Sequence, residues 1–146
     1  MKKTLAFALL AALSASAIAQ QGDTYLSFQP IVAVAVTDGQ LSGKVQFYLR
    51  GQKPPGNITE TFPEAVYDKP AGTQVVNASV ARGCATALRR VLASFEDYAK
   101  KYGANAVVDM VSFHGQEHHA DNARFWCHEE PNGYVVKMRG KPAIIK

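Results

Sequence analysis

Three of the four histidines fall within a stretch of six residues, which is polar throughout. Imidazole and carboxylate groups are ligands that bind zinc, nickel and copper. One interpretation is therefore a transition-metal site formed by His114, His118, His119 and His128, with Glu117, Asp121 and Glu129 nearby. A pair of histidines in a polar hairpin is also typical of a loop that simply faces solvent. We favour the solvated loop and keep the metal site as the alternative.

Catalytic signatures are missing from the sequence. It contains neither Gly-x-Ser-x-Gly nor His-Glu-x-x-His, and no nucleophile has a recognisable base. Asp109 lies in an apolar segment, where burial could raise its pKa, but a lone carboxylate in a strand is more often hydrogen-bonded at an edge or interface. We therefore expect no enzymatic activity and no cofactor.

The two cysteines, Cys84 and Cys127, predict a disulfide bond. Cys84 falls on the apolar side of a long helical segment, and Cys127 falls in the alternating segment 124–129. The competing interpretations are a redox-active pair and two thiolate metal ligands, both of which usually show Cys-x-x-Cys spacing. In an oxidising compartment, a disulfide across so long a loop stabilises a domain by about 4 kcal/mol.

Residues 1–19 have the three regions of a secretory signal peptide. Lys2 and Lys3 precede an apolar run from Leu5 to Leu13, and small residues lead to an expected cleavage after Ala19. The apolar run is too short to span a bilayer, so we expect a soluble periplasmic protein with no stable membrane insertion. Loss of the two lysines leaves 14 basic and 12 acidic residues, a formal charge of +2 that does not favour nucleic acid as a partner.

The remaining residues, 20–146, predict a single α+β domain with a loose leader at 20–30. Its main element is an amphipathic helix that ends at Gly103 and has Asn77 or Ser79 as its N-cap. Apolar side chains recur on one side of this helix at Cys84, Leu88, Val91, Leu92, Phe95, Ala99 and Tyr102. The other side is assigned to solvent, and it includes Arg82, Arg89-Arg90, Glu96, Asp97 and Lys100-Lys101.

Alternating apolar residues predict strands over 44–50, 105–113, 123–129 and 134–139, with a tight turn at Asn132-Gly133. Residues 25–28 and 31–36 are also apolar enough for strands, although a helical turn is an alternative for 31–36. Prolines and glycines between 51 and 77 argue for brief edge pairing at most, and 141–146 is assigned to a tail. The expected fold is one long helix packed on a mainly antiparallel sheet of about four strands, with a single disulfide.

Strand alternation then divides the side chains between the two faces of this sheet. If Cys127 points to the helix, the side chains that accompany it are Phe125, Ala106, Val108 and Met110. Val107 lies on the opposite face, together with an aromatic and partly polar set that forms a candidate binding face: Tyr48, Asp109, Phe113, Trp126 and His128. Such a face favours a homodimer or binding of an envelope protein. Coverage by residues 31–36 or by the proline-rich stretch is the alternative.

Several short motifs are shared with known proteins: Gly83-Cys84, Gly103-Ala104-Asn105-Ala106-Val107-Val108, Ser112, Cys127-His128 and Lys137-Met138-Arg139-Gly140. With segments 41–48 and 52–54, they resemble a group of small bacterial exported proteins, often labelled "excinuclease ATPase subunit", over most of residues 20–146. An ATPase of that kind needs a Gly-x-x-x-x-Gly-Lys-Ser/Thr loop for its phosphates. The sequence lacks this loop, so we treat the label as a naming error.

The Gly-Ala-Asn-Ala turn, and a cysteine that joins helix to sheet, are distantly similar to RcsF-like and YbjQ-like domains. The resemblance to RcsF, an outer-membrane stress-sensor lipoprotein, implies a role in envelope stress. This chain departs from that sensor because it lacks the lipid-anchoring cysteine and a second disulfide. We therefore expect a periplasmic, non-catalytic binding or assembly domain, with transition-metal binding through the loop His114–His119 as the alternative.

Overall fold

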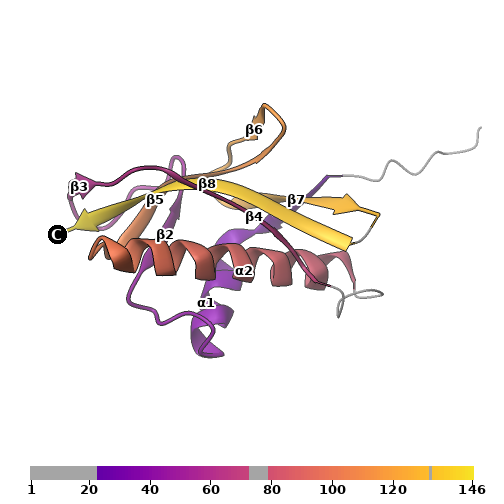
Figure 1. Cartoon of the computed structure of the whole chain (residues 1–146), viewed down its shortest axis with the longest axis horizontal. Coiled ribbons are helices and arrows are strands. Elements are labelled where there is room, and N and C mark those ends of the chain that lie inside the picture. Colours follow the sequence, from indigo (N-terminus) through magenta and orange to yellow (C-terminus); the bar gives the residue numbers. More distant parts are fainter. Residues whose placement is uncertain (1–22, 73–78, 132) are drawn as a thin grey trace, which may run out of the picture.

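The computed structural model describes residues 23–72, 79–131 and 133–146; the expected signal peptide, Asn77 and Asn132 lie outside these ranges. Within them the chain forms two helices and eight strands. In chain order they are β1 (Thr24–Ser27), α1 (Phe28–Thr37), β2 (Gln46–Leu49), β3 (Ile58–Thr61), β4 (Ala65–Pro70), α2 (Val80–Lys101), β5 (Ala106–His114), β6 (Glu117–His119), β7 (Arg124–Glu130) and β8 (Gly133–Ile145). Both helices lie on the same side of the sheet (Figure 1). The expectation of one helix on about four strands is therefore wrong.

Strand β8 organises the sheet, because it pairs antiparallel with β3, β4, β5 and β7. Strand β1 extends the sheet beyond β7, and β6 forms a hairpin with β5. Strand β2 pairs parallel with β5, which makes the sheet mixed. Prolines had argued against strands in 51–77, but Pro63 lies between β3 and β4 and Pro70 is the last residue of β4, so neither interrupts a strand interior. The predicted tail belongs to β8 as far as Ile145.

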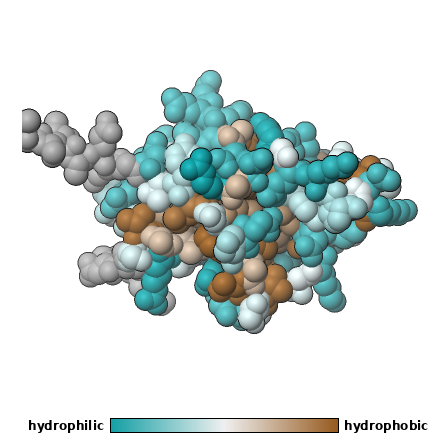
Figure 2. Space-filling model, turned by 180° about the vertical axis from the view of Figure 1, so that it is seen from behind, coloured by the Kyte–Doolittle hydropathy of each residue, from teal (hydrophilic) through white to brown (hydrophobic). Residues whose placement is uncertain are grey.

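Residues 28–37 form helix α1, so for 31–36 the strand is wrong and the helical alternative is confirmed. Pro30 occupies the third position of the helix, where the backbone nitrogen has no intrahelical partner to lose. Only Phe28 and Ala35 are buried in this helix, while Val34 and Val36 are 44% and 38% exposed. The space-filling view in Figure 2 shows apolar surface in its lower part, at the height where α1 projects below the sheet.

Helix α2 agrees closely with the sequence-based expectation. The Ser79 hydroxyl caps it by accepting a hydrogen bond from the Arg82 amide, and Gly103 follows the helix with a φ of +65°. Six of the seven predicted apolar residues are fully buried: Cys84, Leu88, Val91, Leu92, Phe95 and Ala99. Tyr102 is an exception because it is the C-cap and is 39% exposed. No helix in the described ranges is both long and apolar enough to cross a membrane.

Glu96 is the second residue of α2 that differs from the prediction. It was assigned to the solvated side of the helix, but it is only 4% exposed. Its carboxylate accepts the backbone N–H of Ser42 at 3.1 and 3.0 Å and pairs with Lys100. Burial raises the pKa of Glu96, but the hydrogen bonds from Lys100 and Ser42 outweigh burial and leave it below the ordinary value. The buried carboxylate thus holds the loop after α1 against α2.

The predicted disulfide joins Cys84 in α2 to Cys127 in β7, with 5.7 Å between the two Cα atoms. Both cysteines are buried, in the main core between the helices and the sheet. This core also contains large side chains from both layers: Phe28, Leu88, Phe95, Phe125 and Met138. The bond therefore fixes the beginning of the long helix to the strand next to the centre of the sheet.

A bulge at Asp109 changes which side chains of β5 face the helices. Asp109 has a φ of +53°, and the register with β8 shifts between Val108 and Val111. Because an extra residue reverses the alternation, Val107 and Met110 both reach the main core. Ala106 and Val108 form a separate small cluster with Ala143. The assignment of Ala106 and Val108 to the helix face, and of Val107 to the opposite face, is therefore wrong.

Candidate functional site

The face of the sheet opposite α1 and α2, here called the far face, is covered by neither helix (Figure 1). Side chains on it include two groups. One is an aromatic and imidazole cluster, here called the His–Trp cluster, which consists of Tyr25, His114, His119, Trp126 and His128. The other is a charged group around Asp109.

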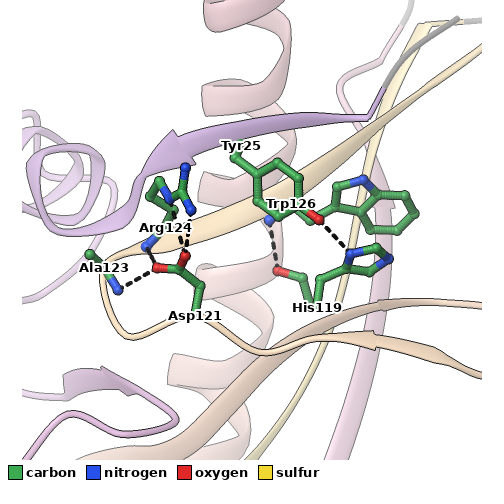
Figure 3. A network of polar contacts seen from close by, with 7 residues as sticks. Tyr25, His119, Asp121, Ala123, Arg124 and Trp126 are labelled. Carbon is green, nitrogen blue, oxygen red and sulfur yellow. Dashed lines mark hydrogen bonds and ion pairs between the residues drawn. The ribbon is translucent and has the colours of Figure 1, made fainter. Parts of the chain in front are cut away.

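Trp126 is at the centre of the His–Trp cluster. The His119 ring stacks on the indole (Figure 3), and the ring centroids are 4.4 Å apart with the planes at 15°. His114 and His128 lie 5.3 and 5.4 Å from the indole centroid, and 4.5 Å from each other. The hairpin of β5 and β6 brings His114 and His119 over Trp126 of β7, and Tyr25 comes from β1, so four strands build the cluster.

Strand β1 and the turn before β7 hold the cluster in place. The Tyr25 hydroxyl lies 2.6 Å from His119 Nδ1 (Figure 3). In the turn, the Asp121 carboxylate accepts the backbone N–H of Ala123 and of Arg124 and pairs with the Arg124 guanidinium. These interactions, the Ala123 hydrogen bond foremost, lower the pKa of Asp121. The Arg124 guanidinium in turn lies 5.3 Å from the Tyr25 ring centroid.

Two ring nitrogens of the cluster are buried without a hydrogen-bond partner among the described residues. They are Trp126 Nε1 and His119 Nε2. The Glu117 carboxylate lies 3.9 Å from His119 Nε2, which is too long for a hydrogen bond, and its side chain is 85% exposed. By contrast, the Trp126 backbone N–H is satisfied by Ser112 Oγ at 3.0 Å. Because buried polar atoms are almost always paired, these two nitrogens are unusual features of the cluster.

Asp109 is an ion-paired carboxylate. Arg50 Nε and Nη2 donate to its two oxygens at 2.7 and 3.2 Å, and Lys141 Nζ lies 3.8 Å away. The Arg50 hydrogen bond is the largest influence and outweighs burial, so the pKa of Asp109 is lowered. The shift is opposite to the raised pKa considered from the sequence, and a carboxylate of this kind is a poor general base.

The predicted binding face is covered more than its aromatic composition suggested. Trp126 is 2% and Phe113 is 6% exposed. Lys137 Nζ and Arg139 Cζ lie over the Phe113 ring at 5.0 and 4.7 Å from its centroid. Tyr48 packs against the small cluster of Ala106, Val108 and Ala143, away from the indole. The accessible part of the His–Trp cluster is its rim, where Tyr25 is 40% exposed and His114 is exposed.

The four histidines of the predicted metal site do not converge on one point. His118 lies against Phe113 with ring centroids 6.2 Å apart, whereas the other three contact Trp126. Among the described residues, no group of three or more His, Cys, Asp or Glu side chains is arranged to hold a metal ion. The geometry therefore gives the metal interpretation no support.

Comparisons with known proteins add no assignment: no family model matches the chain, and no match was found among curated proteins or solved structures.

Proposed function

We propose that the protein is a non-catalytic binding domain of the bacterial periplasm that recognises an extended segment of an envelope protein at the His–Trp cluster. The observation that carries the proposal is the pair of buried, unpartnered ring nitrogens, His119 Nε2 and Trp126 Nε1. Leaving such atoms unpaired costs about 1–3 kcal/mol each. A bound segment that supplies hydrogen-bonding atoms would recover this free energy.

The chemistry of the two nitrogens indicates what the segment must offer. The indole N–H is only a donor. When the Tyr25 hydroxyl donates to His119 Nδ1, the proton of the neutral ring sits on Nε2, which is then a second donor. Two donors on stacked rings suit acceptor oxygens, and the backbone carbonyls of an extended peptide provide such oxygens at regular intervals.

Strand β1 explains why the segment should be extended. It is the end strand of the path β1-β7-β8-β5-β2, and it pairs with β7 so that Tyr25 is opposite Trp126. An end strand offers free backbone N–H and C=O groups to an added strand. A partner strand paired with β1 would run past Tyr25, at the rim of the cluster. The disulfide is compatible with an exported location, and the resemblance to envelope-stress domains supports an envelope partner.

Site-specific photocrosslinking in cells tests this proposal. A photoreactive phenylalanine analogue placed at His118, which is exposed beside the cluster, should give a discrete protein adduct. The same analogue at Lys101, exposed on α2, is the matched control and should not. Once identified and purified, the partner should bind the His119→Ala variant about tenfold more weakly than the wild type, and bind Lys101→Ala unchanged.

The proposal fails if both positions give the same adducts, or if the purified partner binds His119→Ala as tightly as wild type. An adduct between two copies of this chain would replace the envelope partner by a homodimer. Light scattering on the purified protein then distinguishes the two, because only the dimer changes mass in the absence of another protein.

A further inference from the structure

A cavity of about 220 Å³ lies on the opposite side of the molecule from the His–Trp cluster. It is lined by Gln40 from the loop after α1 and by four residues of α2: Thr86, Arg89, Arg90 and Ala93. The helix is anchored by its buried stripe and by the disulfide, so its side of the cavity has a stable backbone. The sequence assigned Arg89-Arg90 to a solvated helix surface. Arg90 is exposed and Arg89 is partly buried, and both line this hollow.

The residues that line the cavity carry two positive charges and no negative charge. Between Ser79 and Phe95 the chain has three arginines and no acidic residue. Two of the arginines line the cavity, and Arg82 precedes Thr86 by one helical turn on the same side of the helix. The carboxylate that approaches is Asp38, whose Oδ2 is 4.0 Å from Arg89 Nη1. Since that aspartate is 51% exposed, the ion pair holds Arg89 only weakly.

The two guanidinium groups are placed to bind a ligand. Arg90 Nη1 donates to the Pro70 carbonyl at 2.7 Å, which fixes the position of its guanidinium. The Arg89 side chain is 27% exposed, and its Nε is buried without a hydrogen-bond partner among the described residues. A buried donor on a charged group needs an acceptor, and an anionic oxygen is the strongest one available. The Thr86 hydroxyl already donates to the Arg82 carbonyl, so the two arginines and the Gln40 amide are the donors of the site.

We infer that this cavity is an oxyanion site that binds a phosphoryl group. Consecutive residues on a helix point about 100° apart, so the two arginines flank a ligand from different directions. A tetrahedral phosphoryl group has oxygens in several directions, whereas a planar carboxylate is satisfied by a single guanidinium fork. The phosphoryl group can come from inorganic phosphate or from a phospholipid headgroup, which offer the same chemistry.

A titration of the oxidised protein with inorganic phosphate at constant ionic strength tests the assignment. The resonance of the Arg89 Nε–H group, followed by NMR, should shift and saturate with a Kd of about 1 mM or below. Arg89→Gln and Arg90→Gln should each weaken binding at least about tenfold. Lys101→Gln makes the same charge change on the same helix away from the cavity, and it should alter the Kd by less than about twofold.

Asp38→Asn should change the affinity for phosphate in the direction opposite to the arginine variants. This test does not require the arginine variants to fold. Removing the carboxylate beside Arg89 should tighten phosphate binding, because it removes a competitor for the guanidinium. Acetate at the same ionic strength should bind about tenfold more weakly than phosphate. Equal binding of acetate would overturn the phosphoryl assignment.

Vesicles identify the source of the phosphoryl group. If the ligand is a lipid headgroup, the protein should float with phosphatidylglycerol vesicles, and phosphatidylcholine vesicles serve as the comparison. Arg89→Gln should abolish this binding and Lys101→Gln should retain it. Saturable phosphate binding without vesicle binding assigns the site to a soluble phosphate. The inference is overturned if the phosphate shifts never saturate, or if Arg89→Gln and Lys101→Gln weaken binding to the same extent. Neither result bears on the His–Trp cluster.

Discussion

Loss of the disulfide between Cys84 and Cys127 should lower the free energy of unfolding by about 4 kcal/mol. The two cysteines are 43 residues apart in the sequence. For a loop of this length, the chain-entropy relation gives about 13 cal/mol/K, which corresponds to about 4 kcal/mol at 25 °C. Small domains are stable by only about 5–15 kcal/mol, so this bond accounts for a large part of the total.

Urea unfolding of three samples measures this contribution. They are the oxidised protein, the same protein with reductant, and the variant Cys84→Ala/Cys127→Ala. Far-UV circular dichroism follows the helices, and fluorescence of the buried Trp126 follows the sheet next to the bond. The reduced and variant proteins should both lose about 4 kcal/mol, and reductant should not affect the variant. A difference between oxidised and reduced protein below about 1 kcal/mol would refute the reasoning.

Three further predictions concern single residues. Glu96→Gln should lower the free energy of unfolding by about 2 kcal/mol at pH 7, because it weakens the charged hydrogen bond from the Ser42 N–H. The pKa of Glu96 is lowered in the folded state, so this stabilisation is present above the unfolded pKa of about 4.3 and is lost as pH falls through the folded pKa. Urea unfolding at pH 7 and at acid pH measures both effects. Gly83→Ala should lower the urea midpoint although alanine favours helix, because its Cβ would overlap the Tyr134 ring. At the positive φ of Asp109, Asp109→Val should cost about 1–2 kcal/mol more than Asp109→Asn, because a β-branched residue disfavours this conformation, and thermal unfolding compares the two.

The sequence is most informative where apolar residues repeat at one regular spacing along a whole element. Helix α2 was predictable because its apolar residues repeat at the helical spacing and Ser79 provides the cap. Helix α1 was only the alternative to a strand, because a short apolar run with no charged residue fits a buried strand equally well. In β5, the side of the sheet was predicted correctly for Met110, which follows the bulge, but not for the residues before it. The apolar pattern before Asp109 gives no sign that an extra residue follows.

For the His–Trp cluster, the sequence predicted some members and missed those that long-range contacts bring in. Alternation placed Trp126 and His128 on one face of the sheet, and both belong to the His–Trp cluster. Tyr25 was not included, because its contact with His119 joins residues 94 positions apart and depends on β1 pairing with β7. The role of His119 was also misjudged. Its position in a polar stretch suggested a metal ligand or a solvated loop, whereas the hairpin of β5 and β6 folds it back onto the indole.

The disulfide connects the two proposed sites. Cys127 lies between Trp126 and His128 of the His–Trp cluster, and Cys84 lies two residues before Thr86 of the arginine-lined cavity. Each site depends on side chains that the main core holds in place, since the cluster uses β7 and the cavity uses α2. Reduction should therefore loosen both sites at once, whereas Arg89→Gln and His119→Ala should each affect one. Binding that survives reduction at either site would show that the site does not need the helix fixed to the sheet.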